Sequence, residues 1–265
     1  MRKIFVFIAM SALTSTSLPA QDFAKQRLEK SSRHQEWVTV KQGERVVHSF
    51  LVFPEVKEKA TAVVVIHENR GLTDWVRSVA DQLAEAGYIA IAPDLLSGMA
   101  PSGGKTSDFP SSDAAREAIS KLAQEQVTAD LNAVADYVAK LPAANGKVAV
   151  AGFCWGGRQS FVFATNRPNL AAAFVFYGTG ADSSDIARIK CPVYGFYGGN
   201  DARVNSTLQQ TTAQMKKVGK IFEPVIYEGA GHGFMRAGEE PNADAANKKA
   251  HEEAWMRWKA LLKKL

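Results

Sequence analysis

The sequence is poor in the features that hold unusual or very small folds together. It contains only two cysteines, Cys154 and Cys191, which excludes a disulfide scaffold and any four-thiolate metal site. Its apolar run near the start, residues 4–10, is too short to span roughly 30 Å of membrane hydrocarbon. Lysine and arginine are scattered among acids, as in residues 248–253, so a formal charge of +5 does not predict nucleic-acid binding. With 46% hydrophobic residues, the 265-residue chain is instead expected to bury a large core.

The first twenty residues have the pattern of a secretory signal peptide. Met1, Arg2 and Lys3 form a charged start, residues 4–10 are apolar, and a small, polar segment runs to Ala20. We therefore predict a signal peptide at 1–20 that is cleaved near Ala20, with export to the bacterial periplasm. Cleavage would lower the formal charge by two. The alternative, an uncleaved anchor, is disfavoured by the short apolar run, and no stable membrane insertion is expected.

Residues 21–265 are predicted to form one domain. A polar stretch to Ser32 is a short helix or a loose arm, and Trp37–Lys41 with Arg45–Phe53 form a hairpin. Further on, apolar strands alternate with amphipathic helices. The strands are expected at residues 62–66, 88–92, 147–151, 172–177, 192–197 and 222–227, and the helices at 74–86, 113–141, 157–165, 205–218 and 243–262. Strands that are apolar on both faces predict an α/β fold with a mostly parallel central sheet and helices on both faces.

The most informative segment is residues 148–157, which read as a strand, then Gly-x-Cys-x-Gly-Gly, then a helix. This is the pattern of a nucleophile elbow with Cys154 where serine is usual. A thiol at a helix N-terminus experiences a partial positive charge, which favours the thiolate. The alternative is a buried structural cysteine beside packing glycines.

Two later strands end in residues that complete a triad. Asp201 follows one strand and His232 follows the last, so the chain order is nucleophile, acid, histidine. All three would lie at the carboxyl edge of the sheet, where open α/β folds keep their sites. Asp201 would orient His232, and His232 would serve Cys154. The alternative for Asp201 alone is a cap of the helix that begins near Val204. The alternative for His232 alone is a solvated loop residue.

A third loop, His67-Glu68-Asn69-Arg70-Gly71, directly follows the strand that ends at Ile66. This position commonly supplies one donor to an oxyanion hole, here the Asn69 N–H, and the residue after the nucleophile, Trp155, supplies the second. Glu68 is unusual because it would place a carboxylate beside the nucleophile. The pair His67-Glu68 lacks a second histidine at helical spacing, so no metal is predicted.

These segments together resemble the dienelactone hydrolase family, the carboxymethylenebutenolidases of the α/β-hydrolase superfamily. The resemblance rests on residues 67–71, Gly152-Phe153-Cys154-Trp155-Gly156-Gly157, Asp201 and Gly231-His232-Gly233-Phe234, and it covers roughly residues 40–263. It implies a hydrolase without a cofactor, whose catalytic residues are Cys154, His232, Asp201 and Glu68. The resemblance also implies that Glu68 binds the resting thiol and helps to deprotonate it, that the thiolate opens a lactone, and that water releases an acyl-enzyme.

The family resemblance also bears on substrate binding. Arginines hold a substrate carboxylate in the family, and Arg236 matches one such position; Arg116 is either a second or a surface cation on a helix. Cys191 is expected to be a small buried residue that is not bridged to Cys154. The expected partner is a small lactone or activated ester, and the sequence indicates no oligomeric state. A general carboxylesterase or thioesterase, and a non-catalytic exported binding protein on the same fold, are the alternatives.

Overall fold

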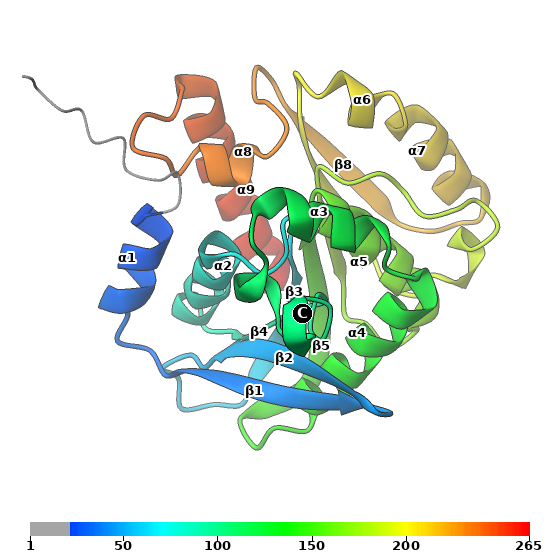
Figure 1. Ribbon diagram of the computed structural model, residues 1–265. Coiled ribbons are helices and arrows are strands. Elements are labelled where there is room, and N and C mark those ends of the chain that lie inside the picture. Colours follow the sequence, from blue (N-terminus) through cyan, green and yellow to red (C-terminus); the bar gives the residue numbers. More distant parts are fainter. Residues whose placement is uncertain (1–21) are drawn as a thin grey trace, which may run out of the picture.

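The computed structural model describes residues 22–265 (Figure 1). The predicted signal peptide lies outside the described residues. The strands are β1 (Gln35–Gln42), β2 (Arg45–Val52), β3 (Ala60–Ile66), β4 (Ile89–Pro93), β5 (Ala144–Phe153), β6 (Ala173–Phe176), β7 (Val193–Gly198) and β8 (Phe222–Tyr227). The helices are α1 (Asp22–Lys30), α2 (Asp74–Glu85), α3 (Ser112–Ser120), α4 (Gln124–Ala139), α5 (Trp155–Asn166), α6 (Ala202–Asn205), α7 (Leu208–Lys217), α8 (Phe234–Ala237) and α9 (Ala245–Leu262).

The strands form one eight-stranded sheet in the order β1-β2-β4-β3-β5-β6-β7-β8. The leading hairpin is antiparallel, with Gln42 opposite Arg45 and Gly43 at φ +58° in the turn, a conformation that suits glycine. β2 also runs antiparallel to β4. The remaining pairs, β4–β3, β3–β5, β5–β6, β6–β7 and β7–β8, are all parallel. The predicted α/β fold with a mostly parallel sheet is confirmed.

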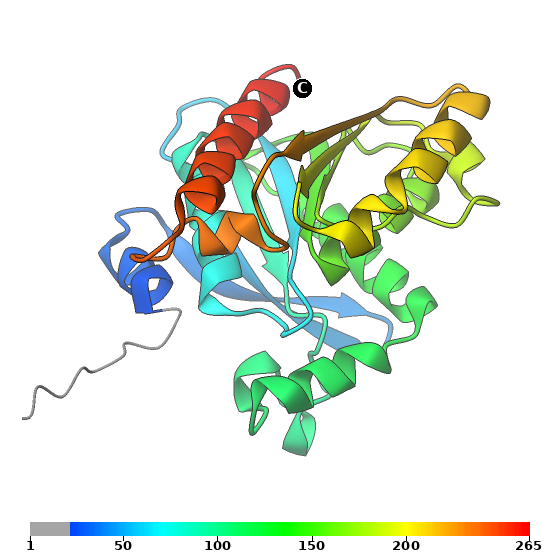
Figure 2. The ribbon, with the colours of Figure 1, turned by 90° about the horizontal axis from the view of Figure 1, so that it is seen from above.

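The central strands are buried on both faces because successive side chains alternate between two hydrophobic layers. In β3, Val63 and Val65 pack in one layer, while Val64 and Ile66 pack in the other. The first layer is covered by α1, α2 and α9, and the second by α4, α5 and α7. Figure 2 shows the two groups of helices on opposite sides of the sheet.

Two local differences separate the structure from the sequence prediction. The helix predicted at 113–141 is two helices, α3 and α4, because Ala123 has extended backbone and the two helices pack on different apolar clusters. The helix predicted at 205–218 begins three residues later, as α7, and the separate short helix α6 precedes it. Of the two alternatives for the polar stretch to Ser32, the helix is the one observed: it is α1, whose Ala24 and Leu28 are buried in the core.

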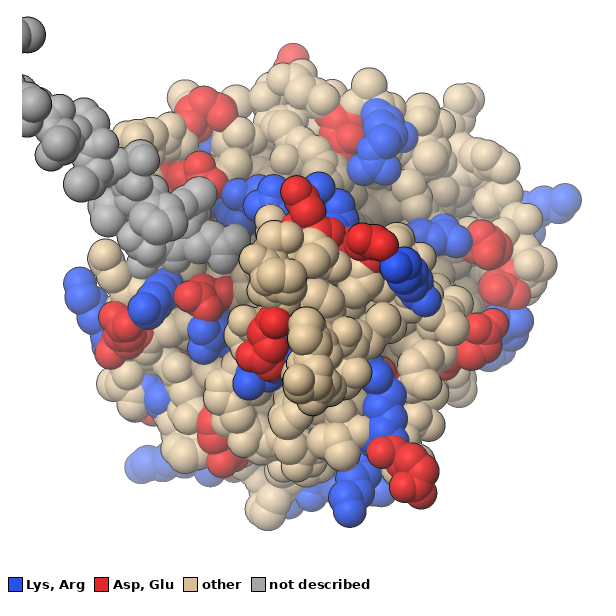
Figure 3. Space-filling view, in the orientation of Figure 1, with Lys and Arg blue, Asp and Glu red and all other residues tan. Residues whose placement is uncertain are grey.

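The parallel strands direct their carboxyl ends to one edge of the sheet. The loops that follow β3, β5, β6, β7 and β8 therefore meet there, and these loops carry every residue that the sequence analysis placed in the triad and the oxyanion hole. None of the helices between residues 22 and 265 combines the length and the apolar character that a membrane crossing requires. On the face seen in Figure 3, basic and acidic side chains are interspersed.

Candidate active site

Cys154 lies at a sharp turn between β5 and α5. Its backbone has φ +56° and ψ −114°, a strained conformation for a residue with a side chain, and its N–H donates to the Phe176 carbonyl at 3.0 Å. Gly156 allows the close packing that this turn needs, because a Cβ there would lie 2.4 Å from the His67 carbonyl oxygen. The geometry is that of a nucleophile elbow, with the partly exposed thiol at the start of a 12-residue helix.

Asp201 and His232 come together although they are 31 residues apart. The Nδ1 of His232 lies 2.5 Å from Oδ2 of Asp201, a carboxylate that is 6% exposed. The other oxygen of Asp201 accepts the Val204 N–H at 3.3 Å, so this residue caps α6 as well as contacting the histidine. The helix-capping alternative and the orienting contact therefore coexist in one side chain.

The environment of His232 favours its charged form. A hydrogen bond with the Cys154 side chain raises the pKa of His232 to about 9; burial opposes the shift, and the hydrogen bond with Asp201 adds to it. The structure thus places His232 against Asp201 and close enough to the Cys154 side chain for that side chain to raise its pKa.

Glu68 lies in the same region but is paired with an arginine. Its Oε2 accepts a hydrogen bond from Nε of Arg236 at 3.3 Å, and Nη1 of Arg236 binds Oε1 of Glu240 at 2.9 Å. Burial raises the pKa of Glu68, and the nearby Arg236 charge opposes that shift. Among the described residues, the carboxylate of Glu68 has its hydrogen bond with Arg236, and no hydrogen bond joins it to the Cys154 thiol as the resemblance implies.

His67 holds the loop that carries Asn69. It is fully buried, its Nδ1–H donates to the Glu68 carbonyl at 2.8 Å, and its Nε2 accepts the Leu95 N–H at 3.3 Å. Burial lowers the pKa of His67, so the ring is neutral and these two bonds fix its tautomer. The ring stacks on Trp155, with centroids 5.5 Å apart and planes at 16°. One side chain therefore contacts both sides of the expected oxyanion hole.

A second set of contacts ties the same loop to the segment after β4. Thr106 Oγ1 accepts the Leu72 N–H at 3.0 Å and donates to Oδ1 of the buried Asp94 at 2.7 Å. Gly71, at φ +81°, leaves the space that Thr106 occupies.

A cavity of about 530 Å³ opens beside Cys154. Asn69 and Trp155 line it, as the oxyanion interpretation expects, and so do the three arginines Arg116, Arg158 and Arg203. Arg116 also forms an exposed ion pair with Asp113, so it is both a surface cation and a lining residue. Arg203 forms no ion pair with any residue in the range 22–265.

Tyr177 is a lining residue that the sequence analysis missed. It is buried, has φ +42°, and meets the His232 ring edge-on with centroids 5.1 Å apart. Burial raises the pKa of Tyr177 well above its ordinary value, so the side chain is a neutral phenol. Its hydroxyl has no hydrogen-bond partner among the described residues. The signal in the sequence is its place at the end of a predicted strand, directly before Gly178.

The other cysteine lies apart from this chemistry. Cys191 is 6% exposed, is not bridged to Cys154, and burial raises the pKa of its thiol to about 11. This confirms its expected role as a small buried residue. Residues 22–265 hold no cluster of three or more His, Cys, Asp or Glu side chains arranged to bind a metal ion.

Comparison with known proteins places the chain in a family. The model of the dienelactone hydrolase family matches residues 47–265. The carboxymethylenebutenolidase of Pseudomonas putida is 30% identical over 197 residues, which cover 71% of this chain and 82% of that protein.

Solved structures show the same fold. A dienelactone hydrolase-like promiscuous phosphotriesterase from metagenomic libraries aligns over 88% of this chain and 98% of its own, with a TM-score of 0.73 and 23% identity. A dienelactone hydrolase from Anabaena variabilis aligns over 84% and 96%, with a TM-score of 0.62 and 21% identity. The chain belongs to the dienelactone hydrolase family, and it is an enzyme that hydrolyses ester bonds.

Proposed function

We propose that this enzyme is an exported cysteine hydrolase that cleaves lactones or activated esters through an acyl-enzyme on Cys154. The observation that carries the proposal is the position of His232, whose Nδ1 lies 2.5 Å from Asp201 Oδ2 and whose pKa is raised chiefly by the Cys154 side chain. A general base that is oriented by a carboxylate and reaches a nucleophile is the arrangement that acyl transfer requires.

The reaction begins when the Cys154 thiolate attacks the carbonyl carbon of the ester or lactone. The carbonyl oxygen becomes an oxyanion that accepts hydrogen bonds from the Asn69 and Trp155 N–H groups. When the tetrahedral intermediate collapses, the C–O bond breaks and imidazolium His232 protonates the leaving oxygen. The product is a thioester on Cys154.

Hydrolysis of that thioester uses the same groups. Neutral His232 accepts a proton from water as the water attacks the acyl carbon, and Asp201 stabilises the imidazolium that forms. Collapse of the second intermediate releases the carboxylic acid and restores the thiolate. Each step keeps the developing negative charge at the same pair of backbone donors.

The lining of the cavity supports an anionic substrate. Arg116, Arg158 and Arg203 line the space beside Cys154, whereas Arg236 is held by Glu68 and Glu240. We therefore assign recognition of a substrate carboxylate to the cavity arginines. Arg203 is the one of the three that forms no ion pair within residues 22–265. Arg236 acts instead on the ionisation of Glu68.

The test is turnover of the mature protein on p-nitrophenyl acetate and on a dienelactone. Cys154→Ala is expected to lose more than about a thousandfold in kcat, because the nucleophile is removed. The Cys191→Ala variant is the matched control and should keep its rate. Unchanged turnover in Cys154→Ala would overturn the cysteine mechanism. Faster turnover of acyl thioesters than of the dienelactone would favour a general thioesterase.

Export is a separate part of the proposal and rests on residues 1–20. Full-length protein with a C-terminal tag, produced in a Gram-negative bacterium, should be recovered from the periplasmic fraction. Its N-terminal sequence should begin near Gln21. Retention in the cytoplasm with Met1 still present would contradict this part and leave the chemistry untouched.

A further inference from the structure

The N-terminal segment lies outside the part of the chain that the family model matches, yet it is firmly attached to the hydrolase core. The family model begins at residue 47, whereas α1 ends at Lys30. Ala24 and Leu28 of α1 are buried against α2. This segment therefore adds a surface to the fold that the matched region does not contain.

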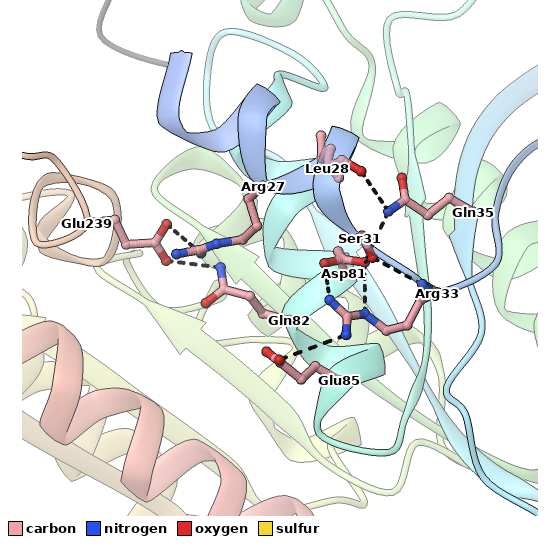
Figure 4. A network of polar contacts seen from close by, with 9 residues as sticks. All are labelled: Arg27, Leu28, Ser31, Arg33, Gln35, Asp81, Gln82, Glu85 and Glu239. Atoms are coloured by element: carbon pink, nitrogen blue, oxygen red, sulfur yellow. Dashed lines mark hydrogen bonds and ion pairs between the residues drawn. The ribbon is translucent and has the colours of Figure 1, made fainter.

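A buried carboxylate on α2 anchors the end of this segment (Figure 4). Asp81 is fully buried and accepts hydrogen bonds from Ser31 Oγ at 2.5 Å, from Arg33 Nε at 2.9 Å and Nη2 at 2.6 Å, and from Gln35 Nε2 at 3.2 Å. The hydrogen bond with Asp81 raises the pKa of Arg33. A buried carboxylate with this many donors fixes the position of the chain that supplies them.

A second contact runs from α1 to the catalytic edge of the sheet. Nη1 of Arg27 lies 3.1 Å from Oε2 of Glu239, and Gln82 of α2 donates to Oε1 of Glu239 at 3.0 Å (Figure 4). The side chain of Glu239 is 3% exposed, so its charge is compensated by these groups. His251 of α9 adds to the cluster, because its Nε2 lies 3.6 Å from Oε1 of Glu239.

Glu239 lies two residues after the end of α8, the short helix that presents Arg236 to Glu68. The Glu239 N–H donates to the Arg236 carbonyl at 3.0 Å, and His251 donates to the Met235 carbonyl at 2.8 Å. α8 has only four residues and is not stable alone, so its position depends on such contacts. The series from Arg27 to Glu239 to Arg236 ends at Glu68, whose carboxylate lies close to Gly233, the residue after His232.

We infer that Arg27 and Glu239 are positioning residues that hold α8 so that Arg236 stays paired with Glu68. In this view α1 helps to hold the active-site residues in position, in addition to packing against α2. The inference rests on the proposed function in one respect, since it takes the Glu68–Arg236 pair to influence turnover.

The experiment is a double-mutant cycle on p-nitrophenyl acetate hydrolysis. Arg27→Ala and Glu239→Gln are each expected to lower kcat by about three- to tenfold, with a smaller effect on KM. In an Arg236→Ala background, Arg27→Ala should cause no further loss, because its effect passes through Arg236. Arg27→Lys should restore part of the rate. The matched control on the same helix is Lys25→Ala, which removes only an exposed pair with Glu29 and should keep the wild-type rate.

A measurement without substrate complements the cycle. Hydrogen exchange of the backbone amides in residues 234–238 should be faster in Arg27→Ala, while exchange in the middle of α9 should be unchanged. Glu239→Gln keeps the shape of the side chain, so it serves as the second variant if Arg27→Ala folds poorly.

The outcomes separate the two proposals. Wild-type kinetics in Arg27→Ala would overturn the inference that Arg27 acts through Arg236. So would a double variant in which the losses of kcat from Arg27→Ala and Arg236→Ala multiply. In either case α1 would only stabilise the fold. Wild-type activity in Arg236→Ala would also overturn the inference, while loss of activity in Cys154→Ala would leave the catalytic proposal standing. Activity in Cys154→Ala would overturn the catalytic proposal by itself.

Discussion

The ring of His67 stacks on the ring of Trp155 with their planes only 16° apart. Through this contact and its hydrogen bond to the Glu68 carbonyl, one neutral histidine joins the two loops that are expected to stabilise the oxyanion. This arrangement makes His67 a residue whose removal should affect the transition state more than substrate binding.

Replacing His67 by Phe keeps an aromatic ring but removes both hydrogen bonds. We expect kcat to fall by about tenfold with little change in KM, because the oxyanion donors lose their alignment. The free energy of unfolding should fall by about 1–3 kcal/mol, since the Glu68 carbonyl and the Leu95 N–H lose a partner. Steady-state kinetics and urea unfolding check the two parts. His67→Asn, whose amide can still donate to Glu68, should recover part of the rate; equal rates in the two variants would contradict this explanation.

His232 should give the folded protein a dependence on pH. Its folded pKa of about 9 is above the ordinary value of 6.5, so protonation stabilises the folded state. That contribution is fully present below pH 6.5 and is lost as the pH rises through 9. Urea unfolding measured between pH 6 and 10 should show the decline, and Cys154→Ala should flatten it because the contact with Cys154 is the largest cause of the shift. A curve of the same shape in both proteins would argue against the Cys154–His232 contact.

Alkylation of Cys154 tests the same contact by a chemical route. At pH 7 His232 carries a positive charge next to the Cys154 side chain, and we expect iodoacetamide to inactivate the enzyme quickly. In His232→Asn the charge is absent and alkylation at pH 7 should slow by about tenfold or more. Mass spectrometry that distinguishes Cys154 from the buried Cys191 measures the rate. Equal rates of Cys154 alkylation in the wild type and in His232→Asn would contradict the interaction between His232 and Cys154.

The pair formed by Glu68 and Arg236 should control the acid limb of the activity profile. Burial raises the pKa of Glu68 and Arg236 opposes that rise, so Arg236→Gln should raise the pKa further. Activity that requires ionised Glu68 would then be lost at a higher pH than in the wild type, as a profile of kcat/KM against pH would show. Glu68→Gln should abolish this limb. An acid limb that stays in place in Glu68→Gln would assign it to another group.

The arginines of the cavity should distinguish anionic from neutral substrates. Arg203→Gln is expected to raise KM by about tenfold for the p-nitrophenyl monoester of a dicarboxylic acid, a loss of about 1.4 kcal/mol. The KM for p-nitrophenyl acetate should not change. Arg116→Gln tests a second arginine that lines the cavity, and Lys121→Gln on the same stretch of chain is the control, because Lys121 pairs with Glu117 and does not line the cavity. An equal change in KM for both esters would remove the basis for an anionic substrate.

The sequence predicts the sheet and its catalytic edge well because both depend on local patterns. Apolar runs such as Ala62–Ile66 are strands wherever a sheet is covered on both faces, and glycines such as Gly156 mark the turn at Cys154. The meeting of Asp201 and His232 follows from the parallel arrangement of the strands that precede them.

What the sequence does not predict depends on pairing between distant residues. The hydrogen bond between Glu68 and Arg236 joins residues 168 apart, and no local pattern shows that it would replace a contact with the thiol. The segment that forms α1 has only two buried apolar residues, Ala24 and Leu28, so its periodicity is weak. The polar contacts that hold it and the residues after it, such as Arg27 with Glu239 and Arg33 with Asp81, also join residues far apart in the chain.

The C-terminal helix sets the order in which the active site can be completed during synthesis. Trp258 of α9 is fully buried and packs edge-on against Phe153, the residue before the nucleophile, and against Phe176, with centroids 6.0 Å and 4.8 Å apart. All eight strands leave the ribosome before this tryptophan does, so the aromatic support beneath Cys154 is missing until α9 docks. A chain whose α9 has not docked therefore lacks the Trp258 part of this packing, while Trp75 and Tyr177 still contact Phe153.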